Sequence, residues 1–153
     1  MLTKDETVAE DVAAEVWVDV TRRLGGFTGD ESAFRGWLFT LARRRAIDAW
    51  RAAQRSRAHL TGDDADLDRA SGHDTAGSAL ERMTTQRALA LIATLPMDQA
   101  EAITLRVIAG LDVKDVARLL GKRPGAVRVA AHRGLRTLAA RLSTQPRHPA
   151  NRR

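Results

Sequence analysis

Cysteine is absent from the 153 residues of the sequence, which excludes disulfides and thiolate metal sites. The four histidines do not have the spacing of a ligand set, so no metal site is predicted. The sequence also lacks a nucleophile–base pair and a phosphate-binding loop. We therefore expect a protein that is not an enzyme and that has no cofactor and no small-molecule substrate.

Aromatic residues and long hydrophobic runs are also scarce. Aromatic side chains make up 4% of the chain, so its core must consist mainly of Ala, Leu, Val and Ile. Ala and Leu favour helices, and runs of β-branched residues, which favour strands, are missing. No apolar stretch approaches the roughly 20 residues of a membrane span, and residues 1–20 are acidic rather than signal-like. These features predict an all-α, cytoplasmic protein without membrane insertion.

Positive charge, in contrast, is plentiful and unevenly distributed. The net charge is +6, but residues 34–57 contain seven bases and one acid, and residues 121–153 contain nine bases and no acid. Residues 58–79, between these blocks, contain five acids and one base. Two separated basic blocks predict contact with a polyanion at two places. The alternative is that they are solvated helix faces followed by a basic tail.

Apolar periodicity divides the chain into two helical units. An apolar residue at every fourth position from Val8 to Leu24 predicts a first helix. A second helix, with Ser32 as its N-cap, is expected to extend to about Arg57. Residues 58–79 have almost no apolar periodicity and are rich in Asp, Gly, Ser and Thr, which is typical of a flexible linker.

The predicted organisation is therefore two small helical domains joined by an acidic, flexible linker. The first domain is expected to comprise residues 1–57 and the second residues 80–143. The linker is residues 58–79, and residues 144–153 are expected to form a basic, disordered tail.

The second domain contains the spacing of a helix-turn-helix. Ala117 is the small residue expected where two helices cross, Gly121 suits a left-handed turn, and Val127 is an apolar anchor on the second helix. Pro124 suits the first position of that helix. Its predicted buried stripe is Val127, Ala131, Leu135, Leu138 and Leu142.

The opposite side of the same helix carries the charge. Arg128, His132 and Arg136 share one face, with Arg133 beside it, and Lys122 and Arg123 precede the helix N-terminus, where phosphate is favoured. A DNA recognition helix needs apolar residues on the face that packs against its own domain and hydrogen-bond donors on the face that meets DNA. The alternative is a helical hairpin with a solvated basic face.

The basic helix in the first domain is also rich in aromatic residues. Phe34 and Trp37 lie at its beginning, where aromatic faces could stack on unpaired bases while arginines follow the nucleic-acid backbone. The alternative assigns Phe34, Trp37 and Trp50 to the core, and for Phe34 and Trp50 we favour the core.

The sequence resembles the bacterial sigma-70 family, specifically the small extracytoplasmic-function (ECF) sigma factors. Three segments carry the resemblance in the expected order: AEDVAAEVWVDV, then FRGWLFTLARRRAIDAWRAAQRSR, then LPMDQAEAITLRVIAGLDVKDVARLLGKRPGAVRVAAHRGLRTL. The match extends from about Val8 to Leu142. It implies a promoter-recognition and transcription-initiation factor that works with core RNA polymerase, which itself forms the bonds.

The resemblance implies three surfaces. The residues implied in binding the clamp helices of the polymerase are Asp11, Glu15 and Trp17. Those implied in melting and holding the −10 promoter element are Trp37, Arg43, Arg44, Arg45, Arg51 and Arg55. Those implied in reading the −35 element as duplex DNA are Lys122, Arg123, Gly125, Arg128, Val129, His132, Arg133 and Arg136.

Further partners follow from the same resemblance. An apolar surface of the second domain would bind the polymerase flap, the acidic linker would lie towards the RNA exit channel, and an anti-sigma factor is expected as a regulator.

The sequence departs from the family pattern at three positions. Only eight residues precede the AED motif, where family members usually have a further helix, so the N-terminal helix is expected to be missing from this sequence. Either the true start lies upstream, or this domain lacks part of its own bundle and holds core polymerase more weakly. Arg44 lies where the family often has Asn, which puts the −10 base preference in doubt. Arg123 replaces a common Ser or Thr cap and exchanges about 1 kcal/mol of capping energy for phosphate attraction.

Two other hypotheses remain. The first is a stand-alone transcription regulator that uses the same helix-turn-helix to bind duplex DNA without polymerase. The second is a truncated, inactive relative that still binds an anti-sigma protein, for which the short N-terminus is the only support.

Overall fold

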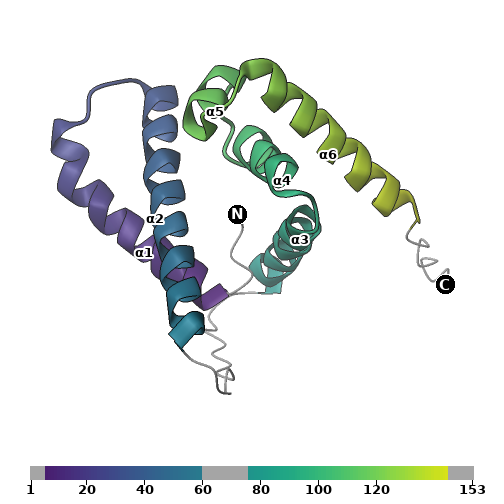
Figure 1. The fold of residues 1–153 in the computed structure, drawn as a ribbon, viewed down its shortest axis with the longest axis horizontal. Coiled ribbons are helices and arrows are strands. Elements are labelled where there is room, and N and C mark those ends of the chain that lie inside the picture. The colour runs from purple at the N-terminus through teal and green to yellow at the C-terminus, as the bar shows by residue number, and fades with distance from the viewer. Residues whose placement is uncertain (1–5, 60–75, 145–153) are drawn as a thin grey trace.

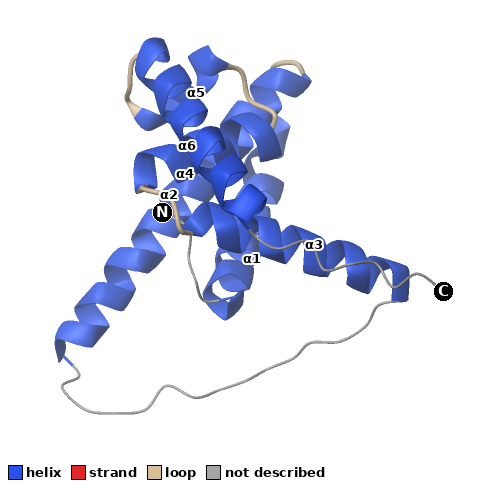
Figure 2. Ribbon diagram, turned by 90° about the vertical axis from the view of Figure 1, so that its right-hand side faces the viewer, coloured by secondary structure: helices blue, strands red, loops and turns tan. Residues whose placement is uncertain are grey.

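The computed structural model describes residues 6–59 and 76–144 of the chain. Within these residues the structure consists of helices and contains no strand, which confirms the all-α expectation (Figure 2). None of the described helices has the length and apolarity needed to cross a membrane. The helices form two groups, an N-terminal unit of α1 and α2 and a C-terminal unit of α3 to α6 (Figure 1).

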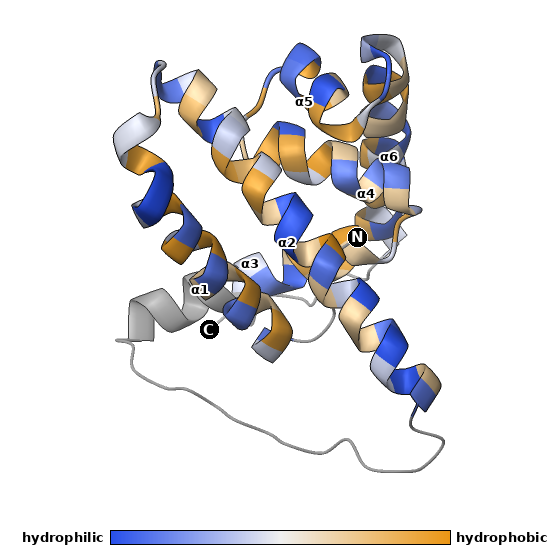
Figure 3. Cartoon of the chain, turned by 60° about the vertical axis from the view of Figure 1, so that its left-hand side comes forward, coloured by the Kyte–Doolittle hydropathy of each residue, from blue (hydrophilic) through white to orange (hydrophobic). Residues whose placement is uncertain are grey.

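The N-terminal unit is a helical hairpin. Helix α1 comprises Glu6–Arg23, a short 3-10 turn follows at Leu24–Gly26, and α2 comprises Glu31–His59. Its small core is formed by Val16 and Val20 of α1 and Leu41 of α2. Figure 3 shows the apolar residues of both helices distributed along the sides where they meet. The every-fourth-residue valine pattern therefore predicts α1 correctly.

The start of α2 differs by two residues from the sequence prediction. Asp30, rather than Ser32, caps the helix, because its Oδ1 accepts a hydrogen bond from the backbone N–H of Ala33 at 2.8 Å. A carboxylate at this position also complements the positive end of the helix dipole. The prediction chose the later of two good capping residues.

The C-terminal unit contains four α-helices and one π-helical turn. Its elements are α3 Ala76–Ala93, α4 Met97–Ile103, the π-helical turn η2 Thr104–Ile108, α5 Val113–Leu120 and α6 Pro124–Thr144. One core cluster joins η2, α5 and α6 through side chains that include Leu105, Val116 and Val127. A second joins α3 and α4 through Ile92, Leu95 and Ile103.

The turn between α5 and α6 has the predicted helix-turn-helix geometry. Asp112 caps α5 by accepting from the backbone N–H of Asp115 at 2.8 Å. Gly121 has φ +64°, and Lys122 N–H donates to Ala117 O at 2.8 Å, which is the hydrogen bond of a Schellman C-cap. Pro124 is the first residue of α6, as expected.

Helix α6 is rotated relative to its predicted buried stripe. The residues that are buried are Val127, Ala130 and Gly134, whereas Leu135 is 47% and Leu142 is 55% exposed. The prediction of Leu135 and Leu142 as core residues is therefore wrong. The reason is the close approach of α4, because a Cβ built on Gly134 would lie 2.5 Å from Cδ1 of Ile103.

The predicted linker is longer than the gap between the helices. Its boundaries, 58–79, extend into both neighbours, since α2 continues to His59 and α3 begins at Ala76. Residues 60–75, and all of the predicted tail after Thr144, lie outside the described residues. Trp50, which we favoured as a core residue, is 45% exposed.

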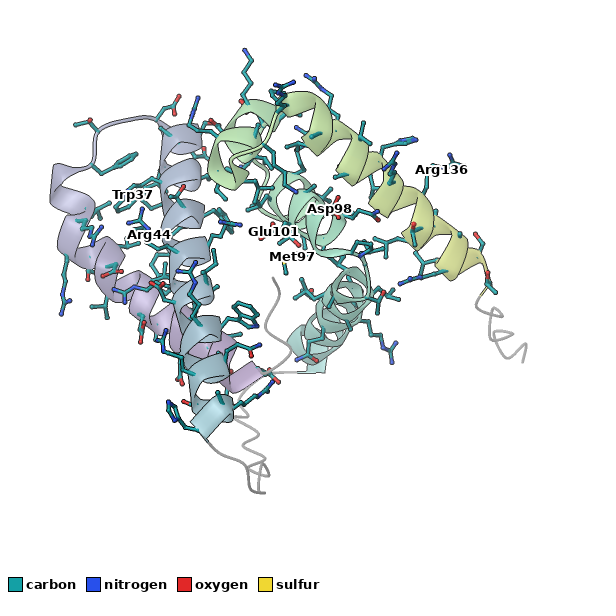
Figure 4. The ribbon with its side chains drawn as sticks, viewed as in Figure 1. Trp37, Arg44, Met97, Asp98, Glu101 and Arg136 are labelled. Carbon is teal, nitrogen blue, oxygen red and sulfur yellow. The ribbon has the colours of Figure 1, made fainter. Side chains whose placement is uncertain are left out.

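The two units are in contact. Phe39 of α2 packs against the core cluster of the C-terminal unit. A cavity of about 380 Å³ also lies between α1, α2 and the α4–η2 segment, and its lining is largely apolar, including Val12, Trp17 and Ile47. The side of α4 that carries Glu101 faces α2 (Figure 4).

Candidate nucleic-acid interface

The residues predicted to read DNA lie in the turn before α6 and along α6 as far as Arg136. All eight are exposed: Lys122, Arg123, Gly125, Arg128, Val129, His132, Arg133 and Arg136. They lie away from the face that buries Val127 and Ala130 in the core. Arg136 projects from the outer side of α6, away from α4 (Figure 4). Burial of one face thus orients the basic face towards solvent, where it could enter a groove.

The arginines of α2 fall into two groups. Arg44, Arg51 and Arg55 are exposed, and they recur at spacings of seven and four residues, which places them on one side of the helix. Arg43 and Arg45 are half-buried and form ion pairs inside the protein. The geometry therefore brings three of the five predicted −10 arginines together on a free surface.

Arg45 connects the two helices of the N-terminal unit. Its Nη2 lies 2.6 Å and its Nε 2.8 Å from Oδ2 of Asp19, and its Nη1 lies 3.4 Å from Oε2 of Glu15. Asp19 is buried, and the hydrogen bond from Arg45 holds the pKa of its carboxyl below the usual range. Asp19 in turn raises the pKa of Arg45. This guanidinium is engaged in holding α1 against α2.

Trp37 lies in an aromatic cluster at the end of the hairpin where the loop joins α1 to α2. Its ring centroid is 5.1 Å from that of Phe27 and 5.7 Å from that of Phe34, and Phe27 meets Phe34 edge to face at 5.6 Å. All three rings are partly exposed. Such pairs stabilise by about 0.5–1.5 kcal/mol beyond their buried area. The cluster therefore supports the start of α2 while still presenting aromatic surface.

The predicted polymerase-binding residues lie on the outside of α1. Asp11, Glu15 and Trp17 are all exposed, Trp17 by 56%. Asp11 and Glu15 lie four residues apart on one side of α1, whereas Trp17 follows Glu15 by two residues and points to a different side, so the three do not form a single surface. Trp17 also lines the cavity between the two units.

The described residues contain no group of three or more His, Asp or Glu side chains that could hold a metal ion. The arrangement offers hydrogen-bond donors, positive charge and aromatic faces, which are groups suited to binding nucleic acid.

Comparisons with known proteins agree with this arrangement. Residues 1–56 match the family model for sigma-70 region 2, and residues 85–138 match that for sigma-70, region 4. The ECF RNA polymerase sigma factor ShbA of Streptomyces griseus is 32% identical over 133 residues, which cover 86% of this chain and 70% of ShbA. The chain belongs to the ECF RNA polymerase sigma factors.

Two further ECF sigma factors are similar over most of the chain. BldN of Streptomyces coelicolor is 32% identical over 142 residues, which cover 93% of this chain and 53% of BldN. SigD of Mycobacterium tuberculosis is 34% identical over 132 residues, which cover 85% of this chain and 61% of SigD. The chain thus spans between half and two thirds of the length of these two relatives.

Two solved structures share the fold. RpoE of Bartonella quintana, in complex with the anti-sigma factor NepR, aligns with a TM-score of 0.64 at 19% identity and covers 94% of this chain and 86% of that one. CnrH, in complex with the cytosolic domain of CnrY, aligns with a TM-score of 0.59 at 23% identity, with coverages of 92% and 75%.

Sequence reasoning missed two acids that matter to the site of this ECF sigma factor. Asp19 and Glu101 pair with Arg45 and Arg43, respectively, and both are less exposed than their partners. Asp19 carried a signal, because it lies three residues after Val16 and therefore on the edge of the apolar stripe. Glu101 carried none, because its partner is 58 residues away in the sequence.

Proposed function

We propose that this chain is a promoter-recognition subunit of RNA polymerase that acts in the cytoplasm and forms no bonds itself. The C-terminal unit would read the −35 element as duplex DNA, and the N-terminal unit would hold the opened −10 element. The observation that carries the proposal is the exposed basic face of α6, on the opposite side from its buried Val127. This division is what insertion of a helix into a major groove requires.

Each surface has residues suited to its task. On α6, Arg128 and Arg133 are candidates for base or phosphate contacts, and Lys122 and Arg123 are placed to attract phosphate at the helix N-terminus. On α2, the exposed Arg44 is a candidate for the −10 strand, together with Arg51 and Arg55. We assign Arg45 a positioning role instead, because Asp19 engages it.

The proposed protein partners are core RNA polymerase and an anti-sigma factor. The exposed acids of α1 would bind the clamp helices, and the exposed apolar side chains Met97, Val107 and Ile108 are candidates for the flap. RpoE of Bartonella quintana was solved with an anti-sigma factor, which supports a similar regulator here. We propose that an apolar segment of the anti-sigma factor binds in the cavity between the units. Trp17 lines that cavity, so the bound segment would make Trp17 inaccessible to polymerase.

Transcription with core enzyme tests the proposal. Purified chain plus bacterial core polymerase is expected to give new transcripts from a promoter library, and core alone is not. Arg128→Ala and Arg133→Ala should each cost about 1–3 kcal/mol of promoter affinity, so −35-dependent initiation falls about fivefold or more while core binding is unchanged. Arg106→Ala is the matched control, because it removes the same exposed charge from η2.

The reverse result is expected for Glu15→Arg, which should weaken core binding and leave duplex contacts unchanged. If Arg128→Ala, Arg133→Ala and Glu15→Arg all lost core binding equally, the assignment of surfaces would be wrong. Specific, salt-sensitive duplex binding without polymerase, seen in a gel-shift, would instead favour the stand-alone regulator.

A further inference from the structure

A small polar cleft lies between α2 and α5, which are in contact in the structure (Figure 1). Its volume is about 290 Å³. The side chains of α2 that line it are Thr40, Arg43, Arg44, Ile47, Asp48 and Arg51, and Leu119 of α5 lines it from the opposite side. The cleft therefore places three guanidiniums, one carboxylate, one hydroxyl and two apolar side chains around one small volume.

The cleft carries a surplus of positive charge. Arg44 and Arg51 are exposed and lie seven residues apart on the same side of α2, so their Cα atoms are about 10.5 Å apart along the helix axis. Two long arginine side chains at this spacing can both reach an anion held between them. Arg43 adds a third charge, but its Nε donates to Oε1 of Glu101 at 3.3 Å. A cleft with charges of one sign and low-dielectric walls focuses the electrostatic field, so an anion is attracted to it.

Phosphate is the anion that these groups fit best. A guanidinium can donate two parallel hydrogen bonds to one phosphate group, and such charge-assisted hydrogen bonds are roughly twice as strong as neutral ones. Thr40 adds no donor, because its hydroxyl already donates to the backbone carbonyl of Gly36 at 2.7 Å. The binding groups are therefore the guanidiniums of Arg44 and Arg51, and two guanidiniums match a ligand with two phosphate groups.

Asp48 and the apolar walls narrow the class of ligand further. An ionised carboxylate only accepts hydrogen bonds, and an inorganic diphosphate offers it mainly negative charge. A nucleoside supplies what is missing, since its ribose hydroxyls and base N–H groups are donors. Ile47 and Leu119, both half-buried, offer apolar surface to the flat face of a base. The volume is close to the lower end of the range for small-molecule sites, which suits one nucleotide rather than a longer strand.

We propose that the cleft between α2 and α5 is a binding site for a nucleoside diphosphate. Arg44 and Arg51 hold its phosphates, and Asp48 accepts a hydrogen bond from its ribose or base. The base lies between Ile47 and Leu119. The regulatory meaning of the site rests on the proposed function, because a bound nucleotide would compete with the −10 strand for Arg44 and Arg51, but binding itself can be tested without DNA or polymerase.

The first experiment measures binding of a fluorescent nucleoside diphosphate to the full chain by anisotropy. Arg44→Gln and Arg51→Gln each remove one guanidinium of the site, whereas Arg57→Gln removes the same charge from an exposed position of α2 outside the cleft. The first two variants should each bind about tenfold more weakly, as expected for lost hydrogen bonds to a charged group, and Arg57→Gln less than about twofold more weakly. Equal losses in all three variants, or no saturable binding to the unsubstituted chain, would overturn the proposal.

The second experiment tests the wall that α5 contributes. Leu119→Ala shortens that wall, and Leu120→Ala is its matched control, because Leu120 is the next residue, is also half-buried and packs against the same core cluster, but does not line the cleft. Leu119→Ala should weaken nucleotide binding about threefold or more through the lost apolar contact, with Leu120→Ala unchanged. The same affinity in both variants would contradict a base between Ile47 and Leu119 and overturn the proposal.

A comparison of two ligands separates a nucleotide site from a site for diphosphate alone. In competition with the fluorescent ligand, an unlabelled nucleoside diphosphate should bind about threefold or more tightly than inorganic pyrophosphate. Asp48→Ala should reduce this ratio, because it removes the acceptor for the nucleoside and favours both anions electrostatically. Pyrophosphate that binds the unsubstituted chain as tightly as the nucleotide, or a ratio unchanged by Asp48→Ala, would overturn the assignment of a nucleotide.

The outcomes also separate this inference from the proposed function. Saturable nucleotide binding that depends on Arg44 and Arg51, in a chain that gives no transcripts with core polymerase, would keep the site and reject the sigma-factor role. Transcription with core polymerase by a chain whose nucleotide binding is unaffected by Arg44→Gln and Arg51→Gln would do the opposite.

Discussion

The rotation of α6 about its axis decides which residues face DNA, and three alanine substitutions test it. Val127 is 1% exposed in the core cluster, whereas Val129, two residues along the same helix, is 49% exposed. Leu135 belongs to the stripe that the sequence predicts to be buried, but it is 47% exposed. Each orientation of α6 gives a different order of stabilities for Val127→Ala, Val129→Ala and Leu135→Ala.

The expected magnitudes follow from burial. Val→Ala removes two methyl groups, about 1.6 kcal/mol of transfer free energy. If the site does not collapse, a cavity of roughly 50 Å³ adds about 1 kcal/mol. The higher helix propensity of Ala returns about 0.5 kcal/mol, so Val127→Ala should cost about 2 kcal/mol. The propensity gain is the same at Val129, where half of the side chain is already solvated, so Val129→Ala should be near neutral.

Urea denaturation followed by circular dichroism gives the free energy of unfolding for each variant. Leu135→Ala should cost less than about 1 kcal/mol, compared with about 2–5 kcal/mol for a buried leucine. A loss at Leu135 as large as that at Val127 would refute the observed rotation. It would also mean that the predicted DNA face, with Arg128 and His132, is turned partly towards the core.

Three further predictions concern local contacts. Asp19→Asn should destabilise the chain at neutral pH, because it removes the carboxylate that pairs with Arg45. Since the pKa of Asp19 is lowered in the folded chain, the stability from this pair is present above the usual aspartate pKa and is lost as pH falls through the lowered one. Thermal melts of both proteins should therefore converge in acid, and a constant difference would contradict the pairing. Asp112→Ala should cost about 1 kcal/mol by removing the cap of α5, whereas Asp112→Asn should keep most of it in the same melts. Gly121→Ala should cost about 1–2 kcal/mol because φ is +64°, and Gly121→Asn should cost less; equal losses would argue against the left-handed turn.

Local signals predict the helices of this protein well. The capping carboxylate of Asp112, the left-handed Gly121 and Pro124 at a first helical position act within a few residues, so their effect does not depend on the rest of the fold. The same holds for the basic face of α6, whose residues share a side by helical periodicity alone. The start of α2 was missed by two residues, because Asp30 and Ser32 are both good caps.

Contacts between distant residues are not visible in such signals. Arg43, Arg44 and Arg45 are consecutive and chemically identical, but the fold pairs Arg43 with Glu101 and Arg45 with Asp19, and leaves Arg44 exposed. In the sequence, Trp50 also looks like a core residue. The structure leaves it 45% exposed, which could be known only from where the neighbours of α2 lie.

By itself the sequence determined the all-helical class, the two units, the helix-turn-helix and the two blocks of positive charge, because these depend on composition and short-range periodicity. Only the tertiary structure decided the rotation of α6. Gly134 has no side chain, so Ile103 of α4 can lie close to α6 at that position, and helical periodicity alone does not predict this contact. The tertiary structure also decided which arginines are free and that the units dock through Phe39 and Glu101. Those choices depend on where other helices lie, and helical spacing carries no information about them.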